Sequence, residues 1–380
     1  MISIKQSSAA RRETGDRILA WTVFVLVVFG LLMLSSASGP SAYAKFGDPF
    51  WFVKHQILFG LIPGAVALFF FLRFPYRHLQ KLAFPLLIVS IVLLLLVFIP
   101  GIGAKWGTSR SWISIFGYSL QPSEIVKLTF LIYLAAWLEK RGEDVRDVSF
   151  GLLPFLLVIG TVSALLLLEP DMGGMAVIIG TALVVYFLAG APFKHLTLVV
   201  GGGLGVLLLL ISMVPYRVAR FTTFLNPSLD PRGIGYHVNQ ALLAIGSGGI
   251  FGLGFGNSRQ KFLYLPEVEG DSIFAVMAEE IGFILTLVFL FAILFFAHRG
   301  LKIARSAPDR FGQLLAGGIV AWFIIQYFVN IGGLLSLLPL TGLTLPFISY
   351  GGTSLFVSLA AIGILLNISR NMHSSAFAHP

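Results

Sequence analysis

The chain has 380 residues, of which 57% are hydrophobic and only 11% are charged, whereas a soluble domain is about a quarter charged. Apolar runs at 22–34 and 85–98 are too long for a globular core, because one membrane-spanning helix needs about 20 apolar residues. Composition therefore excludes an ordinary soluble protein. It predicts an all-α, polytopic integral membrane protein whose backbone hydrogen bonds close within helices.

Two further function classes are excluded at this level. The chain contains no cysteine, so disulfides and thiolate chemistry are ruled out. The net charge of +9 could indicate nucleic-acid binding. However, the basic residues follow the predicted topology, so no nucleic-acid partner is expected.

About ten membrane spans are predicted in one membrane domain over residues 18–369. Lys and Arg are concentrated in the segments that are cytoplasmic if the N-terminus is inside. Residues 1–17 and 370–380 are therefore predicted to be cytoplasmic tails, and no cleavable signal peptide is expected. The predicted spans are 18–36, 56–73, 82–99, 122–138, 150–168, 172–190, 195–213, 272–297, 312–336 and 352–369.

One long outer loop, 214–271, separates the seventh and eighth spans. Its glycine run at 246–258 does not match a dinucleotide-binding fingerprint, and no phosphate-binding P-loop occurs anywhere in the chain. The cytoplasmic loops are short. An ATPase or a soluble catalytic domain on that side is therefore not expected.

The loop ends in an acidic cluster, YLPEVEGDSIFAVMAEE, at residues 264–280. Asp271 can be read as the N-cap of the eighth span, or as a general base at the outer membrane surface. Glu279 and Glu280 lie deeper in that span, where ionisable groups are costly. One of them is expected to pair with a buried cation.

Two more segments place polar groups at the outer side. Pro122 suits a helix start, and Glu124 lies in the following first turn, three residues before Lys127 on the same helix face. This pair can neutralise itself, or Lys127 can hold a phosphate. Pro and Gly interrupt 338–356, and irregular backbone at membrane depth must be buried or line a cavity. Ser349, Gly351 and Gly352 there can bind an anion at a helix start, or only pack.

Cations and carboxylates thus converge on the outer side beside the membrane. This arrangement suits a substrate with a phosphorylated polar head and a lipid tail. The basic residues considered for its phosphates are Lys105, Arg110, Lys127, Arg217 and Arg220.

At this point four stretches become recognisable: 109–128, 226–267, DSIFAVMAEEIG and TGLTLPFISYGGTS. The chain resembles the SEDS family (shape, elongation, division and sporulation proteins) from Asp16 to Ser369. The stretch GNSRQKFLYLPE favours the division branch over the elongation branch. The resemblance implies a SEDS-type fold with the large extracytoplasmic loop between helices 7 and 8.

The resemblance also implies an activity. Family members are peptidoglycan glycosyltransferases that polymerise lipid II, and Asp271 occupies the position of their catalytic aspartate. The family usually reads H-T-D-F-I-F-A there, whereas this chain has Glu269, Gly270, Asp271 and Ser272. Glu269 is outside the motif and is expected to matter little. Glu124 and Lys127 match a functionally sensitive pair of the family.

The implied reaction is attack of an acceptor 4-hydroxyl on C1 of the donor sugar, with Asp271 as general base. Undecaprenyl pyrophosphate leaves, and the anomeric centre inverts. No cofactor is required by any motif, although a divalent cation (Mg²⁺ or Mn²⁺) is compatible with the leaving group. A single-span class B penicillin-binding transpeptidase and other division proteins are the implied partners. Two alternatives stay open, a lipid II flippase and a non-catalytic division scaffold.

Overall fold

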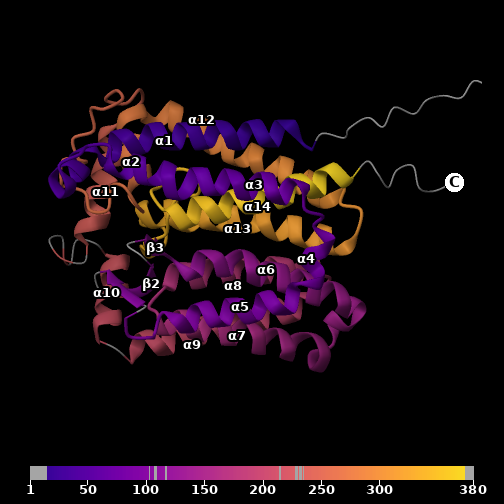
Figure 1. Cartoon of the computed structure of the whole chain (residues 1–380). Helices are drawn as coiled ribbons and strands as arrows, with labels where there is room; N and C mark the ends of the chain where they lie inside the picture. The colour runs from indigo at the N-terminus through magenta and orange to yellow at the C-terminus, as the bar shows by residue number, and fades with distance from the viewer. Residues whose placement is uncertain are drawn as a thin grey trace, which may run out of the picture.

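The computed structural model describes residues 15–101, 103–106, 109–115, 118–213, 215–226, 230, 233 and 235–372. These residues form a bundle of long helices that run roughly alongside one another (Figure 1). The helices of the N-terminal half are α1 (Arg17–Phe46), α2 (Trp51–Gln56), α3 (Ile62–Arg73), α4 (Arg77–Lys81), α5 (Ala83–Leu96), α6 (Pro122–Arg141), α7 (Leu153–Leu168) and α8 (Met172–Leu188). Those that follow are α9 (Phe193–Ser212), α10 (Pro215–Leu225), α11 (Tyr236–Ser247), α12 (Ile273–Arg305), α13 (Arg310–Leu334) and α14 (Gly352–Asn371).

Each predicted span lies on a helix of the described chain. Three short helical turns, η1 (Ile57–Leu61), η2 (Gly142–Arg146) and η3 (Val148–Leu152), extend or link these helices. Six continuous helices are long and apolar enough to cross a membrane, and three shorter apolar helices accompany them. The polytopic all-α prediction is thus confirmed, while the number of crossings stays a prediction.

Local sequence explains where several helices begin. Asp16, Asp171 and Asp309 precede α1, α8 and α13, and each carboxylate accepts a hydrogen bond from a backbone N–H three residues on. A capping aspartate satisfies one of the donors that a helix start leaves unpaired. Pro122 stands at the first position of α6, where its missing N–H costs nothing.

α14 lies in the interior of the bundle, between α3 and α13 (Figure 1). Glycines let α3 and α14 approach closely. A Cβ at Gly363 would lie 2.6 Å from the carbonyl oxygen of Leu68, and one at Gly64 would lie 2.7 Å from Leu359. Small residues at helix contacts are typical of membrane bundles, where close packing replaces the hydrophobic effect.

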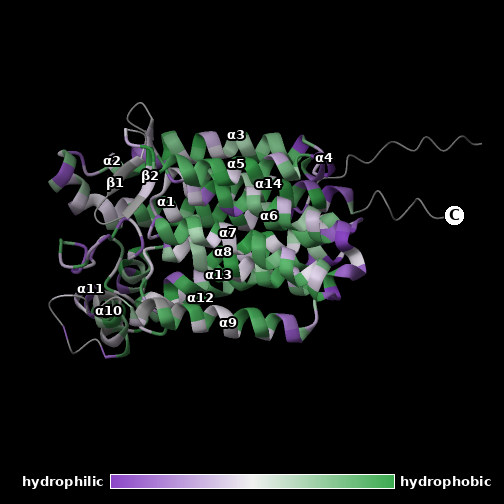
Figure 2. Ribbon diagram, turned by 90° about the horizontal axis from the view of Figure 1, so that it is seen from below, coloured by the Kyte–Doolittle hydropathy of each residue, from purple (hydrophilic) through white to green (hydrophobic). Residues whose placement is uncertain are grey.

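The two ends of the bundle carry different structural elements. At one end, Asp16 accepts from Arg299 at 2.6 Å, and its backbone N–H donates to Ser369 at 2.9 Å. The start of α1 therefore lies beside the end of α14. Figure 2 shows hydrophobic residues along the middle of the bundle and hydrophilic residues at both ends. Which end faces the cytoplasm stays a prediction.

The opposite end carries α2, α10, α11 and a small sheet that the sequence analysis does not anticipate (Figure 1). Strands β1 (Gly103–Trp106), β2 (Ser109–Ile115) and β3 (Tyr118–Leu120) pair antiparallel in the order β1-β2-β3. The strands are three to seven residues long. They were missed because such short segments carry little periodic signal.

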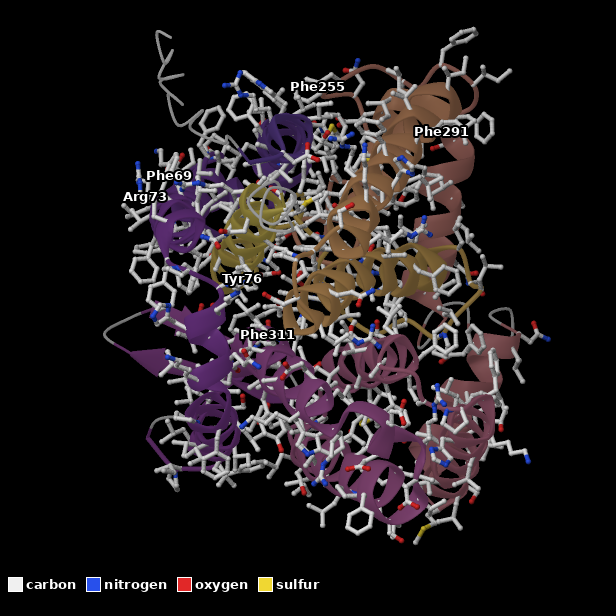
Figure 3. The ribbon with its side chains drawn as sticks, turned by 90° about the vertical axis from the view of Figure 1, so that its right-hand side faces the viewer. Phe69, Arg73, Tyr76, Phe255, Phe291 and Phe311 are labelled. Carbon is white, nitrogen blue, oxygen red and sulfur yellow. The ribbon has the colours of Figure 1, made fainter. Side chains whose placement is uncertain are left out.

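The bundle presents apolar side chains outward as well as inward. Phe69 and Phe291 are 55% and 65% exposed, whereas Tyr76 and Phe311 are buried. Figure 3 shows the first pair at the periphery and the second pair between helices. Exposed apolar side chains of this kind are expected where lipid replaces water as the solvent.

Candidate active site

Asp271 lies at the end of the bundle that carries the sheet, two residues before α12. The helix begins at Ile273, its N-cap is Ser272, and no side chain caps it. The N-cap interpretation of Asp271 is therefore wrong. Its carboxylate accepts from the Ser272 hydroxyl at 3.3 Å and lies 3.9 Å from His237 Nε2.

Neighbouring segments fix the backbone around Asp271. The carbonyl oxygen of Asp271 accepts from Asn330 Nδ2 of α13 at 2.9 Å. The carbonyl of Gly270 accepts from Ser349 Oγ at 2.7 Å, and that of Glu269 accepts from the Tyr350 N–H at 2.8 Å. The carboxylate is thus positioned through main-chain contacts and is itself left available for chemistry.

Burial makes this carboxylate an unusually strong base. Asp271 is 8% exposed. Desolvation, assisted by the nearby Glu267 charge, raises its pKa to about 7, although the Ser272 hydrogen bond opposes this rise. A base is most useful when its pKa lies near the working pH. Asp271 is therefore poised to accept a proton at neutral pH.

Glu269 makes more contacts than the sequence analysis expects. Its carboxylate binds Lys45 Nζ at 2.9 Å and Ser41 Oγ at 3.1 Å, both from α1. Its charge also contributes to the raised pKa of Asp271. The expectation that Glu269 matters little does not fit this structure, because a change there alters both the α1 contact and the field at Asp271.

Glu279 and Glu280 hold the loop that leads to Asp271. Glu280 pairs with Lys261 Nζ at 2.7 Å, and both groups are almost fully buried. Glu279 accepts from Ser258 Oγ and from the backbone N–H of Arg259 at 3.1 Å. The prediction that one of the two glutamates pairs with a buried cation is confirmed.

α12 is broken just after these glutamates, at Gly282, whose φ of 74° and ψ of −179° are not helical. The glycine-rich loop fills the break. The N–H groups of Leu253 and Gly254 donate to the carbonyls of Glu279 and Glu280 at 3.0 and 2.9 Å. Backbone groups at this depth must be satisfied within the protein, and the loop supplies those partners.

Glu124 and Lys127 form the predicted pair on α6. Their Oε1–Nζ distance is 2.7 Å, and their side chains are 3% and 1% exposed. Lys127 Nζ also donates to Gln326 Oε1 of α13 at 2.9 Å and lies over the Trp322 ring. These contacts leave Lys127 no exposed face for a phosphate in this conformation. The mutual-neutralisation interpretation fits the structure better.

α13 connects this pair with Asp271. Gln326 Nε2 donates to the carbonyl of Thr344 at 2.8 Å, and Asn330, one turn further, donates to the carbonyl of Leu343 at 2.6 Å. Asn330 also holds the Asp271 carbonyl. The irregular segment 335–351 is therefore clamped between the charge pair and the candidate base.

The predicted anion site at the start of α14 is used internally. Ser349 Oγ accepts from the Leu345 N–H and donates to Gly270 O. The Gly351 N–H donates to Gln56 Oε1 at 2.9 Å. A Cβ at Gly352 would lie 3.3 Å from the carbonyl oxygen of Phe59, so this position is closely packed. Ser349 and Gly351 therefore fix the backbone of this segment against Gly270 and Gln56. The interpretation that these residues only pack is favoured over an anion site.

Four predicted cations lie where the structure gives only backbone. Lys105 and Arg110 belong to β1 and β2, and Arg217 and Arg220 belong to α10. Their side chains lie outside the described residues. These three elements lie at the same end of the bundle as α11 (Figure 1). A phosphate-binding role for these residues stays a prediction.

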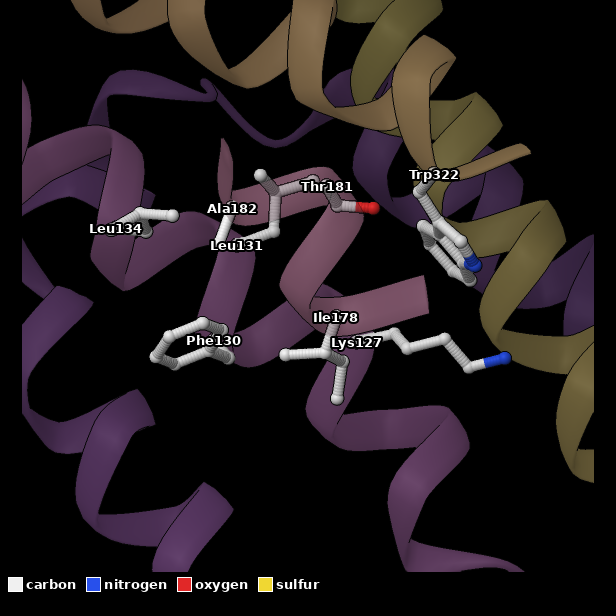
Figure 4. Close-up of a pocket in the computed structure, with 8 residues that line it drawn as sticks. All are labelled: Lys127, Phe130, Leu131, Leu134, Ile178, Thr181, Ala182 and Trp322. Atoms are coloured by element: carbon white, nitrogen blue, oxygen red, sulfur yellow. The ribbon is translucent and has the colours of Figure 1, made fainter. Parts of the chain in front are cut away.

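A small enclosed cavity lies beside the charge pair, between α6, α8 and α13. Figure 4 shows the Lys127 side chain along its edge, with Thr181 and Trp322 on opposite helices. Its volume of about 10 Å³ is roughly that of one water molecule. It is far too small for a sugar or pyrophosphate, so it is not a substrate site.

A second acidic pair, Glu169 and Asp171, was not singled out from the sequence. Burial, together with the charge of Asp171, raises the pKa of Glu169 to about 8. The Ser111 hydroxyl of β2 donates to the Glu169 carbonyl at 2.8 Å. The signal was available in the sequence as E-P-D at the end of an apolar run.

Among the described residues, no group of three or more His, Cys, Asp or Glu could hold a metal ion.

The fold and site define a class: a polytopic α-helical membrane protein with a buried carboxylate at one end of its helix bundle. The sequence profile of the cell cycle protein family of FtsW, RodA and SpoVE matches residues 17–374. The chain belongs to this family.

Curated relatives cover almost the whole chain. Stage V sporulation protein E of Bacillus subtilis is 41% identical over 95% of this chain and 98% of its own. A probable peptidoglycan glycosyltransferase FtsW of Trichlorobacter lovleyi is 40% identical, over 94% of this chain and 93% of its own. The sporulation protein and the FtsW relative thus match this chain almost equally. Percentage sequence identity alone therefore does not assign the chain to the division branch of the family.

Solved structures share the fold. The rod shape determining protein RodA of Thermus thermophilus superposes with a TM-score of 0.70 at 30% identity, covering 94% of this chain and 98% of its own. A chain from a structure described as "Structural coordination of polymerization and crosslinking by a peptidoglycan synthase complex" superposes with a TM-score of 0.78, also at 30% identity. It covers the same shares of both chains.

Proposed function

We propose that this protein is a peptidoglycan glycosyltransferase that polymerises lipid II at the outer face of the bacterial plasma membrane, with Asp271 as general base. The observation that carries the proposal is the state of Asp271. Burial raises its pKa to about 7, its backbone is fixed from α13 and from 335–351, and its carboxylate caps no helix. Relatives that match over more than nine-tenths of this chain bear the name of that activity.

The reaction makes few demands beyond a base and cations. Asp271 takes the proton of the acceptor 4-hydroxyl as the oxygen bonds to C1 of the donor sugar. The C1–oxygen bond to undecaprenyl pyrophosphate breaks, and the leaving group keeps the electron pair. A single displacement inverts the anomeric centre. The pyrophosphate needs positive charge, for which Lys105, Arg110, Arg217 and Arg220 are the candidates.

A flippase needs a polar route through the bilayer, and the described residues offer little for one. Glu279 and Glu280 are engaged by the 256–261 loop. Glu124 and Lys127 pair with each other. The enclosed cavity near them has a volume of only about 10 Å³. We therefore favour a surface-located transferase.

A crosslinking partner completes the proposal. One structural neighbour comes from a peptidoglycan synthase complex that coordinates polymerisation and crosslinking. We infer that a class B penicillin-binding transpeptidase assembles with this chain at the division septum. The motif GNSRQKFLYLPE supports division over elongation, and the similarity to a sporulation protein makes septum formation during sporulation the alternative setting.

The test is polymerisation by the purified protein with lipid II as sole substrate, alone and with the transpeptidase. Glycan strands that depend on Asp271 support a polymerase. Movement of labelled lipid II across vesicles without polymer formation would instead indicate a flippase. Absence of both activities, with or without the partner, would indicate a scaffold.

A further inference from the structure

We propose that His237, acting through the Ser272 hydroxyl, takes over the proton that Asp271 removes from the acceptor sugar and passes it to water. The inference rests on the proposed role of Asp271 as general base. It adds a proton exit, with His237 and Ser272 as positioning residues that do not touch the substrate. A base that retained its proton would be unavailable for the next sugar, so a polymerase needs such an exit in every cycle.

The contacts form a continuous chain. Ser272 Oγ lies 3.3 Å from Asp271 Oδ1 and is hydrogen-bonded to His237 Nε2 on its other side. His237 Nε2 is itself only 3.9 Å from Asp271 Oδ1. A hydroxyl can donate and accept at the same time. It can therefore receive the proton of Asp271 while giving its own to the imidazole.

The imidazole at the end of this chain of contacts is the most exposed of the three side chains. Ser272 is fully buried, the Asp271 side chain is 9% exposed, and the His237 side chain is 19% exposed. The imidazole thus offers a more open path to water than the carboxylate. α11, which carries His237, packs along the first part of α12. A Cβ at Gly248, just after α11, would lie 2.3 Å from the carbonyl oxygen of Ala278.

Among the described side chains, no carboxylate or other imidazole is joined to the Asp271 carboxylate by a hydrogen bond. From its own loop, Glu267 and Glu269 face it with like charge, and Glu269 is bound to Lys45. From α13 comes the uncharged Asn330, which binds its carbonyl. His237 of α11 is the titratable group in direct reach.

An imidazole suits this role, because a histidine side chain can take up and release a proton near physiological pH. Burial raises the pKa of Asp271 to about 7. The hydroxyl of this path comes from Ser272, at a position where the family usually has phenylalanine.

The test measures kcat, KM and the pH dependence of lipid II polymerisation for His237→Gln and Ser272→Ala. Glutamine keeps a hydrogen-bonding group at 237 but does not titrate. Alanine at 272 removes no helix cap, because Ser272 makes no side-chain capping bond. His298→Gln is the matched control, since His298 is exposed at the far part of α12.

We expect both variants to lower kcat on the order of 10²-fold, the lower part of the range for positioned acid–base groups, with little change in KM. In the unmodified protein both Asp271 and His237 must be unprotonated for the relay to work, so log kcat should rise with a limiting slope of about 2 on the acid side of the pH profile. Each variant should reduce that slope to about 1. Added imidazole should partly restore the rate of a His237→Gly variant.

The outcomes separate this inference from the proposed function. If Asp271→Asn is inactive while both relay variants keep the kcat and slope of the unmodified protein, the relay is refuted and the base stands. A raised KM with unchanged slope, and no rescue by imidazole, would also refute the relay by showing a purely structural role. An active Asp271→Asn variant would overturn the base assignment and the relay together.

Discussion

Replacing Asp271 with asparagine separates chemistry from structure at this site. Asparagine has nearly the same shape and can still accept from the Ser272 hydroxyl. The contacts that fix the segment use the main chain, at the carbonyls of Asp271 and Gly270, and are unchanged by the substitution. The variant should fold and insert normally but lose the ability to accept a proton.

The expected loss of activity is on the order of 10²–10⁴-fold, the usual contribution of a positioned general base. Stability should move in the opposite direction. The rise in the pKa of Asp271 from its ordinary 3.8 to about 7 corresponds to roughly 4 kcal/mol against the charged carboxylate above pH 7. Asparagine removes this penalty, so the variant should be inactive and yet at least as stable as the unmodified protein.

The sign of the pH dependence follows from the raised pKa. Between about pH 4 and pH 7 the folded protein binds this proton more tightly than the unfolded chain, so stability falls as the pH rises. The stability advantage of Asp271→Asn should therefore be absent near pH 4 and largest above pH 7. Polymerisation by the unmodified protein should rise with pH, because only the deprotonated carboxylate is a base.

The assay is the rate of glycan strand formation from lipid II at matched protein amounts, beside thermal unfolding at pH 5 and pH 8. Asp48→Asn is the control. Asp48 lies in the turn between α1 and α2, where it pairs with Lys54 at 2.6 Å and accepts from the Phe50 N–H at 3.0 Å, and both charged side chains are partly open to solvent. Near-normal strands from Asp271→Asn would refute the base assignment, as would equal losses in the two variants.

Three further predictions concern the scaffold. Glu124→Gln or Lys127→Met alone should lower the free energy of unfolding by about 3–5 kcal/mol, because each leaves one buried charge unpaired. The double variant should recover most of that loss in unfolding experiments. Equal losses in all three variants would contradict the pairing. Gly282→Ala should prevent stable folding, because the new Cβ would lie 2.1 Å from the Gly252 nitrogen and the φ of residue 282 is 74°. Gly246→Ala is the control: that position has open space around it, so the substitution should change the free energy of unfolding by at most about 1 kcal/mol. A reporter fused after Asn371 should be active only in the cytoplasm, and activity outside the cell would contradict the predicted topology.

Apolar runs predicted the helices well because lipid-facing and core-facing residues are both apolar here. The main error in length is at α1, which continues to Phe46 instead of ending near residue 36. The segment SASGPSAYAKF reads as a loop by composition. Tertiary contacts hold it as a helix, because Ser36 donates to Glu280 at 2.7 Å and Lys45 pairs with Glu269 at 2.9 Å.

The sequence predicted which residues belong to the site, but not which of them contact one another. Glu124 and Lys127 are three residues apart on one helix, so their pairing follows from helix geometry. Lys261 and Glu280 are joined across a loop and a helix break, and no periodic pattern encodes such a contact. His237 reaches Asp271 only because α11 packs along α12, which is a tertiary fact that local sequence does not contain.

These pairings explain why carboxylates gather before and within the start of α12. Glu280 has Lys261 and Glu269 has Lys45, while Glu279 is held by hydroxyl and backbone donors of the 256–261 loop. Among the described side chains, Asp271 has no lysine or arginine within ion-pair distance. The partnered glutamates fix the loop on both sides of Asp271, so its carboxylate cannot move out to water to recover its ordinary pKa. The same burial that costs folding free energy therefore provides the basicity that the proposed role of Asp271 in sugar transfer requires.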